Sequence, residues 1–361
     1  MKLQKTLGGA AAVAGLLALS LASSGTAQAD TNVGNTTTLV ATGSDTTQDV
    51  MEGLSGVVKD ANGNPLLSNY KATAIGRTIN TRTGNANCSF TVPKNSGEGT
   101  DALSAAMRGA TFAGSPAVVG GAVVTSANMT NCVNVARTSS GNNPTTSPGI
   151  GTITYVPFAT DSVTYATQAA SGIPHSLNKA DLVAIYTANT GSCIFEPLIP
   201  APGSGTRSFW AKFLGLTDTF GTGGWGTCVK DTIGTVQVQE HDGRALTNGN
   251  QLVPISVAQF IAQTSGTISD LRGNASLGAI DFTSANSGVQ AAVSPILLQS
   301  NYSTATRTVY NAVPTAALAT APTSTVFSGS TSLICSNSLT ISQYGFAPIS
   351  TCGATTKTNT N

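Results

Sequence analysis

The chain passes three times from a loop rich in Gly, Ser and Thr into a segment with helical spacing. In the first unit, a short strand at 38–41 leads through Gly43 to apolar residues that recur at helical spacing from Val50 to Val58. Two further loops, at 95–100 and 203–206, precede helices in the same way. Strand-like runs lie at 153–156, 162–165, 193–199, 235–239 and 308–313. Strands that alternate with helices predict an α/β fold.

Capping signals indicate where two of the helices begin. Asp45, followed three residues later by Gln48, has the pattern of an N-cap with its capping-box partner. Asn178 occupies the N-cap position before a helical segment at 179–186. Two segments rich in Pro, Ser, Thr and Gly are typical of surface loops and lie at 140–151 and 314–332.

The chain carries very few charges. Charged residues make up 9% of its 361 residues, against roughly 25% in ordinary soluble domains. This composition excludes a coiled coil, and with a net charge of +1 it offers no strongly basic face for nucleic acid or an anionic membrane. The length is sufficient for two domains, each with its own core.

The N-terminus has the pattern of a secretory signal peptide. Lys2 and Lys5 precede an apolar run at 10–21, and small residues flank Gln28 at a cleavage site after Ala29. The run is shorter than the roughly 20 residues that a membrane-spanning helix needs. We therefore expect residues 1–29 to be removed, residues 30–37 to form a flexible leader, and the protein to be secreted, extracellular or held in the cell envelope. No Cys follows the cleavage site to carry a lipid anchor.

Six cysteines behind a signal peptide predict disulfides formed in an oxidising compartment. We expect sequential pairing, because each bond then closes one local excursion of the chain. A zinc site is the competing interpretation, but the sequence has no C-x-x-C spacing and only two histidines, His175 and His241. The expected pairs are Cys88–Cys132, Cys193–Cys228 and Cys335–Cys352.

The three loops have a composition that suits an anion. The first turn of a helix has unsatisfied N–H groups and the positive end of the helix dipole. Glycines let the backbone approach a ligand closely, and Ser and Thr hydroxyls donate hydrogen bonds without adding charge. If the fold brings the loops together, they would bind a small oxyanion through neutral donors.

The segment Gly203-Ser204-Gly205-Thr206 resembles the anion-binding loop of the phosphate-binding proteins that serve ABC transporters, whose pattern is G-S-G-T before a helix. Other segments follow in the order found in that family, which makes the set more specific than G-S-G-T alone. Residues 43–47 resemble its first phosphate loop, 96–99 its second loop, 132–140 a strand and turn with a further ligand contact, and 242–243 and 252–255 parts of its second lobe. The resemblance covers about residues 38–350.

This resemblance implies the two-lobed type II periplasmic-binding-protein fold, with the ligand between the lobes and two chain crossings near 152–158 and 304–310. The first lobe would comprise residues 38–155 and 308–361, and the second lobe residues 156–307. Hinge closure over inorganic phosphate or a similar oxyanion is the expected motion. The ligand would pass to the membrane subunits of an ABC importer. The expected protein is a monomer and a non-enzyme, with no metal or cofactor.

Carried over position by position, the resemblance implies phosphate ligands from both lobes. Two positions depart from the family: Pro200 stands where it has an arginine, and Ser139 stands near the place of its ligand-contacting acid. Arg137 or Arg207 would supply the guanidinium, and Asp45 the carboxylate that accepts the proton of hydrogenphosphate and repels sulfate. The expected ligand set is Ser44, Asp45, Thr46, Ser96, Gly97, Arg137, Ser139, Ser204, Gly205, Thr206, Arg207 and Asp242.

Two other classes of function remain open from the sequence. An extracellular structural or adhesive protein on the same fold, without ligand, fits the Thr/Asn-rich composition and the two departures. A secreted phosphatase-like hydrolase would need His175 or His241 to reach a serine, and Gly203-Ser204-Gly205 is not the G-x-S-x-G nucleophile elbow. Single residues also have plain structural interpretations: Asp45 as an N-cap, Asp161 and Asp242 in turns, and His241 in a solvated loop.

Overall fold

The computed structural model describes residues 30–35, 37–73, 76–116, 121–141, 152–280 and 305–359, so the predicted signal peptide lies outside it. The described part confirms the α/β prediction: a ten-stranded mixed sheet has the order β10-β13-β8-β16-β7-β1-β2, and β14, β17 and β18 also pair with β8. Its strands are Glu196–Pro197 (β10), Gln251–Ser256 (β13), Ile153–Gln168 (β8), Thr306–Pro314 (β16), Val135–Thr138 (β7), Leu39–Gly43 (β1), Leu67–Asn69 (β2), Ala275–Leu277 (β14), Ala347–Pro348 (β17) and Thr358–Asn359 (β18).

Helices and small ribbons complete the described structure. The helices are Gln48–Val57 (α1), Ser96–Arg108 (α2), Lys179–Thr187 (α3), Gly205–Leu214 (α4), Val257–Thr264 (α5), Thr323–Phe327 (α7), Leu333–Ser336 (α8) and Ser338–Gln343 (α9), with 3-10 turns at Ala86–Cys88 (η1), Gly243–Ala245 (η2) and Thr315–Ala319 (η4). The two-stranded ribbons pair Thr78–Asn80 (β3) with Ser89–Thr91 (β4), Phe112–Ala113 (β5) with Thr125–Ser126 (β6), Thr232–Ile233 (β11) with Val236–Gln237 (β12), and Ser176–Leu177 (β9) with Ala279–Ile280 (β15).

Strand β8 is the longest element of the sheet. The sequence pattern predicts two short strands at 153–156 and 162–165, but the structure has one strand over both and the residues between them. Nine of its first ten residues, all but Phe158, pair with β16, and residues 163–167 pair with β13. The strand thus changes its pairing partner from β16 to β13 along its length. A sequence pattern based on local alternation of apolar and polar residues cannot show that the two predicted segments form one strand.

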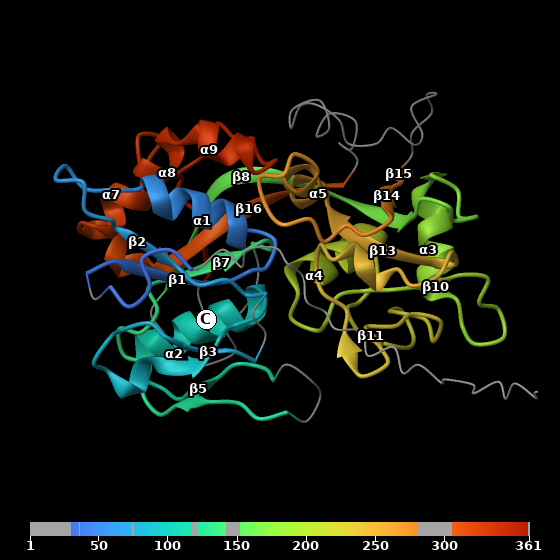
Figure 1. The fold of residues 1–361 in the computed structure, drawn as a ribbon, viewed down its shortest axis with the longest axis horizontal. Helices are drawn as coiled ribbons and strands as arrows, with labels where there is room; N and C mark the ends of the chain where they lie inside the picture. The colour runs from blue at the N-terminus through green and yellow to red at the C-terminus, as the bar shows by residue number, and fades with distance from the viewer. Residues whose placement is uncertain are drawn as a thin grey trace, which may run out of the picture.

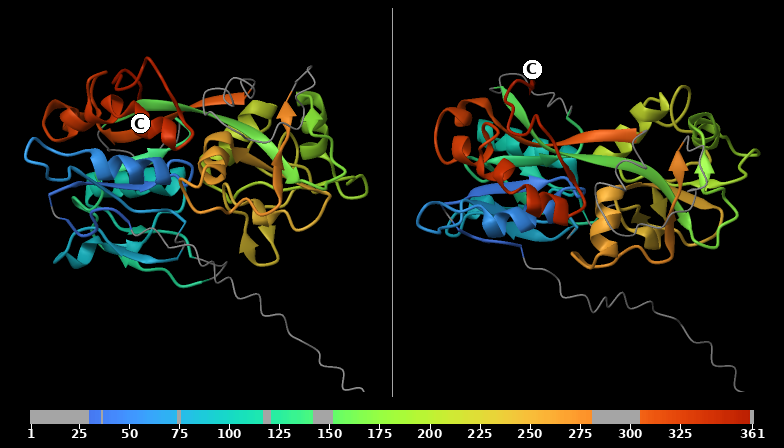
Figure 2. Two further views of the ribbon diagram at one scale, coloured as in Figure 1. Left: turned by 45° about the horizontal axis from the view of Figure 1, so that its top comes forward. Right: turned by 90° about the horizontal axis from the view of Figure 1, so that it is seen from above.

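The elements gather in two groups, between which β8 and β16 run (Figures 1 and 2). The first group holds β1, α1, β2, α2, β7 and the C-terminal helices α7–α9, and the second holds α3, α4, β10, β13, α5 and β14. The first group buries one apolar cluster around Met51 and Phe327, which Ala258 of α5 also joins, and another around Phe90 and Leu103. In the second group, Trp210 is buried in a cluster around α4.

The three predicted disulfides are confirmed. Cys88 bonds to Cys132 across 44 residues, Cys193 to Cys228 across 35, and Cys335 to Cys352 across 17. Each bond lies within one of the two groups, so the covalent links stabilise the groups separately. No helix in the described ranges is long and apolar enough to cross a membrane.

Some local predictions differ from the structure. The strand expected at 193–199 is reduced to Glu196–Pro197, because Cys193 is tied to Cys228 and Ile194 stands 79% exposed. The segment 314–332 contains η4 and α7, and the buried Phe327 anchors it to the core. Residues 30–35 form turns instead of a free leader, since Asn32 donates hydrogen bonds to the carbonyls of Ser55 and Leu67. Of the loop predicted at 140–151, residues 142–151 lie outside the described residues.

The contact between α2 and β1 yields a test with a built-in control. A Cβ on Gly99 would lie 2.5 Å from the Cα of Gly43, whereas a Cβ on Gly56, in α1, would meet nothing within 4 Å. We expect Gly99→Ala to lower the free energy of unfolding by about 1–3 kcal/mol through overpacking. Gly56→Ala should raise it by about 0.5–1 kcal/mol. Urea unfolding of both variants measures the difference, and equal effects would contradict the close approach of α2 to β1.

Candidate functional site

The loop before α1 presents Thr46 to the interior. Gly43 has φ of +110°, a conformation that favours glycine, and the N–H of Ser44 donates to the carbonyl of Arg137 in β7. The predicted N-cap differs from the structure: Thr47 stands at that position without a side-chain cap bond, and Asp45 instead accepts a hydrogen bond of 2.9 Å from Nε2 of Gln48. Asp45 is therefore a buried carboxylate beside the loop and not a helix cap.

The loops before α2 and α4 touch each other. Asn95, the N-cap of α2, donates through Nδ2 to the carbonyl of Pro202, and the N–H of Gly97 donates to the carbonyl of Gly203. Ser204 caps α4 by accepting the N–H of Arg207. Two of the predicted donors, Gly97 N–H and Ser204 Oγ, thus hold the loops in place.

Gly205 sits where a larger residue would not fit. A Cβ there would lie 2.3 Å from Oγ of Ser139 and 2.6 Å from Oγ of Ser96. Those two hydroxyls are 3.3 Å apart, and Ser96 Oγ also accepts the N–H of Ser139. The three Gly/Ser/Thr loops therefore meet, together with the turn after β7, as the anion-site prediction requires.

Thr46 and Thr206 form the centre of this meeting point. Their hydroxyl oxygens lie 3.3 Å apart, and both donate to Oε2 of Glu240, at 2.7 and 2.9 Å. Arg307 reaches both hydroxyls from β16, with Nη1 3.0 Å from Thr206 Oγ1 and Nη2 3.1 Å from Thr46 Oγ1. We call Thr46, Ser96, Ser139, Thr206 and Arg307 the donor cluster; every member is buried.

Arg307 is fixed by Asp161. Its Nε and Nη2 donate to Oδ2 of Asp161 at 3.1 and 2.9 Å, and both side chains are at most 3% exposed. Oδ1 of Asp161 accepts from Ser256 Oγ and from the N–H of Ala258 at the start of α5. The turn interpretation of Asp161 is therefore wrong: it lies inside β8 and orients the guanidinium at the site.

The two arginines predicted to supply this guanidinium lie elsewhere. Arg137 donates to the carbonyls of Ala41, Gly43 and Ser44, so it braces the β1 loop from behind, and burial lowers its pKa to about 10. Arg207 pairs with Asp218 and Asp231. Asp242 accepts from the Arg244 side chain, outside the donor cluster. The sequence analysis does not identify Arg307 or Glu240 as site residues. The one signal for Arg307 is that it is a charged residue next to a predicted strand, in a chain with few charged residues.

Two neighbouring carboxylates have opposite pKa shifts. Burial opposes ionisation of Glu240, but the hydrogen bond from His241 and the positive charge of Arg307 outweigh it and hold the pKa of Glu240 below its ordinary value. Burial, followed by the charges of Glu240 and Asp49, raises the pKa of Asp45 well above its ordinary value. The site therefore holds one firmly ionised carboxylate and one that resists ionisation.

His241 is buried, at 5% exposure, and so is not the solvated loop residue expected from the sequence. Its φ of +60° is unusual for a residue other than glycine. Nε2 lies 3.1 Å from Thr46 Oγ1 and 3.2 Å from Glu240 Oε2, and Nδ1 accepts the N–H of Ser256. Because Nδ1 is an acceptor, the neutral ring carries its proton on Nε2 and donates it toward Glu240.

This tautomer decides two chemical alternatives. Asp45, Glu240 and His241 offer ligand atoms within 4.8 Å of one another, close enough to surround a metal ion. A protonated Nε2 does not coordinate a metal, so the hydrogen bonding of the set does not fit one. The same proton prevents His241 from acting as a base on Thr46, and no carboxylate orients Nδ1 as in a hydrolase triad.

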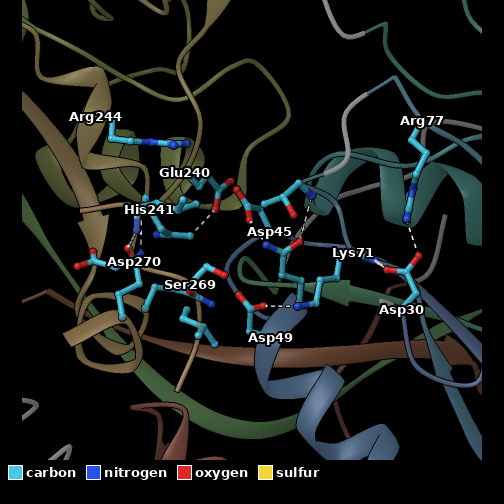
Figure 3. A pocket seen from close by; sticks show the side chains of 16 residues that line it. Asp30, Asp45, Asp49, Lys71, Arg77, Glu240, His241, Arg244, Ser269 and Asp270 are labelled. Carbon is cyan, nitrogen blue, oxygen red and sulfur yellow. Dashed lines mark hydrogen bonds and ion pairs between the residues drawn. The ribbon is translucent and has the colours of Figure 1, made fainter. Parts of the chain in front are cut away.

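A cavity of about 490 Å³ adjoins the donor cluster. Its lining comes from both groups: Asp45, Asp49 and Lys71 on one side, and Glu240 and His241 with the segment 268–271 on the other. Figure 3 shows Asp45 and Glu240 next to each other on its wall. Asp45, Glu240 and His241 thus stand between the donor cluster and an open space of ligand size.

Several solved structures similar to this chain are described as phosphate-binding proteins. One is described as a phosphate ABC transporter substrate-binding protein with bound phosphate from Clostridium perfringens (14% identity, 86% of this chain and 99% of that chain, TM-score 0.49). Another is an ABC-type phosphate transport receptor from Vibrio cholerae (12%, 86% and 100%, 0.47). A third is the high-affinity periplasmic phosphate-binding protein PfluDING, bound with phosphate (15%, 87% and 91%, 0.46).

The resemblance expected from the ordered loops is thus found among solved structures. No protein-family model matches the chain, and no curated protein matches it. At these identities and TM-scores, the similarities assign no residue its role.

The raised pKa of Asp45 predicts a pH-dependent stability. An acid whose pKa is raised on folding opposes the folded state at pH values above its unfolded pKa, and this opposition vanishes when the pH falls below that value. Asp45→Asn keeps an oxygen for Gln48 but carries no charge, so it should raise Tm near pH 8 and leave it nearly unchanged near pH 3. Thermal unfolding at both pH values gives the measurement.

A second carboxylate provides the matched control for that experiment. Asp60 is only partly buried, and hydrogen bonds from Asn64 lower its pKa, so Asp60→Asn should not raise Tm near pH 8. An Asp45→Asn variant that is less stable than the parent near pH 8 would contradict the buried, uncompensated state of this carboxylate.

Proposed function

We propose that this chain is a secreted solute receptor that binds inorganic phosphate, or a similar tetrahedral oxyanion, at the donor cluster. The observation that carries the proposal is a chain of four hydroxyls that ends on one guanidinium. Ser139 contacts the hydroxyls of Ser96 and Thr46, and the hydroxyls of Thr46 and Thr206 accept from Arg307. Hydroxyl donors beside the starts of three helices suit an oxyanion, and a single arginine adds charge without a basic patch.

The two groups of elements act as the two lobes in this proposal. Strands β8 and β16 would be the crossings, and the lobes would comprise residues 38–155 with 308–361, and residues 156–307. Support comes from the position of the donor cluster: Thr46, Ser96 and Ser139 belong to the first group and Thr206 to the second. Contacts such as Gly97 N–H to the Gly203 carbonyl would form when the lobes close over a ligand.

Glu240 is the internal competitor for the same donors. Its Oε2 accepts hydrogen bonds from Thr46 and Thr206. Each hydroxyl has one proton, so an oxyanion that takes these hydrogen bonds displaces the carboxylate. Displaced but still ionised, Glu240 accepts a hydrogen bond from protonated phosphate and repels fully ionised sulfate. Glu240 thus takes the acceptor role that the sequence suggests for Asp45, whose own ionisation is suppressed.

The remaining parts of the proposal concern the cell. The signal-peptide pattern and the three disulfides are consistent with export, and the membrane subunits of an ABC importer would receive the ligand. Calorimetric titration of refolded, phosphate-free protein with phosphate, sulfate and arsenate tests binding directly. Heat from none of the three would favour the structural or adhesive alternative, and turnover of a phosphoester would favour the hydrolase.

Removal of one hydroxyl measures its share of the binding. Thr206→Val keeps the shape but loses a hydrogen bond to a charged group, worth about 1.5–3 kcal/mol, so phosphate affinity should fall about 10- to 100-fold. Thr190→Val, at an exposed threonine that pairs with Thr227, is the matched control and should bind like the parent. Unchanged affinity in a folded Thr206→Val variant would remove the donor cluster as the phosphate site.

Selectivity tests the role of Glu240. Glu240→Gln removes the charge that repels sulfate, so the ratio of phosphate to sulfate affinity should fall about tenfold or more. Glu196→Gln, at a partly exposed carboxylate paired with Lys230, should leave the ratio unchanged. The same titrations give both ratios, and an unaltered ratio in Glu240→Gln would rule out this carboxylate as the selective group.

A further inference from the structure

The cavity beside the donor cluster is too large for a tetrahedral oxyanion alone. Its volume of about 490 Å³ lies in the range of sites for small organic molecules, which is roughly 300–1,000 Å³. It opens between the two groups, and one wall carries Asp45 and Glu240 (Figure 3). A ligand with its oxyanion at the donor cluster would therefore have space for a further substituent on this side.

The charges on the cavity wall favour a positive substituent. The cations that line it have carboxylate partners of their own: Lys71 pairs with Asp49, Arg77 with Asp30, and Arg244 with Asp242. Among the described residues, Asp45 forms no ion pair, and its hydrogen-bond donor is the neutral amide of Gln48. Among the described carboxylates that line the cavity, Asp45 is thus the one without a cation beside it. Burial and its acidic neighbours suppress its ionisation, and a cation placed next to it would favour the ionised form.

Glu240 also presents an unsatisfied oxygen. Its side chain is 4% exposed, and Oε2 accepts the two threonine hydroxyls, yet Oε1 has no hydrogen-bond partner among the described residues. A buried carboxylate oxygen without a donor is costly, and a ligand N–H would satisfy it. Repulsion between Glu240 and Asp45, which helps to raise the pKa of Asp45, would fall when a cation lies between them.

We propose that the cavity is the second half of a ligand site, and that the preferred ligand is a short zwitterion: a phosphonate or phosphate monoester that carries a primary ammonium group. The ammonium would lie between Asp45 and Glu240 Oε1, and the oxyanion at the donor cluster. One carboxylate, Glu240, touches both places, so the two ligand groups are joined by a short linker. This inference rests on the proposed oxyanion-receptor function and narrows its substrate class.

The experiment compares matched ligands by calorimetry in buffer with EDTA, so that no divalent cation replaces the ammonium. The four probes are inorganic phosphate, ethylphosphonate, 2-aminoethylphosphonate and ethylamine. We expect 2-aminoethylphosphonate to bind about tenfold or more tightly than ethylphosphonate, and ethylamine alone to give no measurable heat. Asp45→Asn should reduce this amine preference to less than about threefold. Asp60→Asn, which removes an equal charge outside the cavity lining, should retain it.

The outcomes separate the two proposals. If phosphate binds but 2-aminoethylphosphonate is no tighter than ethylphosphonate, the zwitterion inference is overturned and the oxyanion receptor stands. If neither phosphate nor either phosphonate binds, the proposed function itself fails. An amine preference that survives in Asp45→Asn and in Glu240→Gln also overturns the inference. The second variant provides this readout if the first does not fold, as judged by its Tm.

Discussion

The buried ion pair between Arg307 and Asp161 is the interaction on which the site depends. It joins β16 to β8, and Asp161 in turn accepts the N–H of Ala258 at the start of α5. Taking both charges out of water is costly unless every polar atom finds a partner. Here Arg307 finds its partners in Asp161, Thr46 and Thr206, so the donor hydroxyls also satisfy the guanidinium. Loss of either charge would therefore disturb the sheet and the donor cluster together.

The few charged residues near the donor cluster are buried, and hydroxyl groups supply most of the hydrogen-bond donors there. Only 9% of the residues are charged, yet Arg137, Arg307, Asp161 and Glu240 are all buried around the place where the loops meet. Small residues make that meeting possible, because Gly205 allows the start of α4 to reach the hydroxyls of the first group. These four charges thus act inside the molecule, where they fix the positions of the loops and strands around them.

The sequence predicts what depends on neighbours along the chain and misses what depends on the sheet. The α/β class, the starts of α3 and α4, and the three disulfides follow from local periodicity, caps and spacing. Arg307 and Asp161 could not be found in this way, because strand pairing between β16 and β8 brings them together from 146 residues apart. Arg137 lies near a predicted ligand loop in the sequence, which makes it a candidate for the guanidinium of the site. Its position in β7 instead directs its side chain to the backbone carbonyls of Ala41 and Gly43.

Under the proposed function, the opposite shifts of Asp45 and Glu240 would let a nearly neutral protein discriminate among anions. Two buried carboxylates at such a short distance cannot both ionise freely. The negative charge is favoured on Glu240, where His241 and Arg307 stabilise it. That charge accepts the hydrogen bonds of the two threonine hydroxyls. An anion bound at the donor cluster, as proposed, would have to displace this carboxylate. The displacement would weaken the binding of all anions, but least for one that returns a proton or a cation to Glu240, so the competing carboxylate would itself be the source of selectivity.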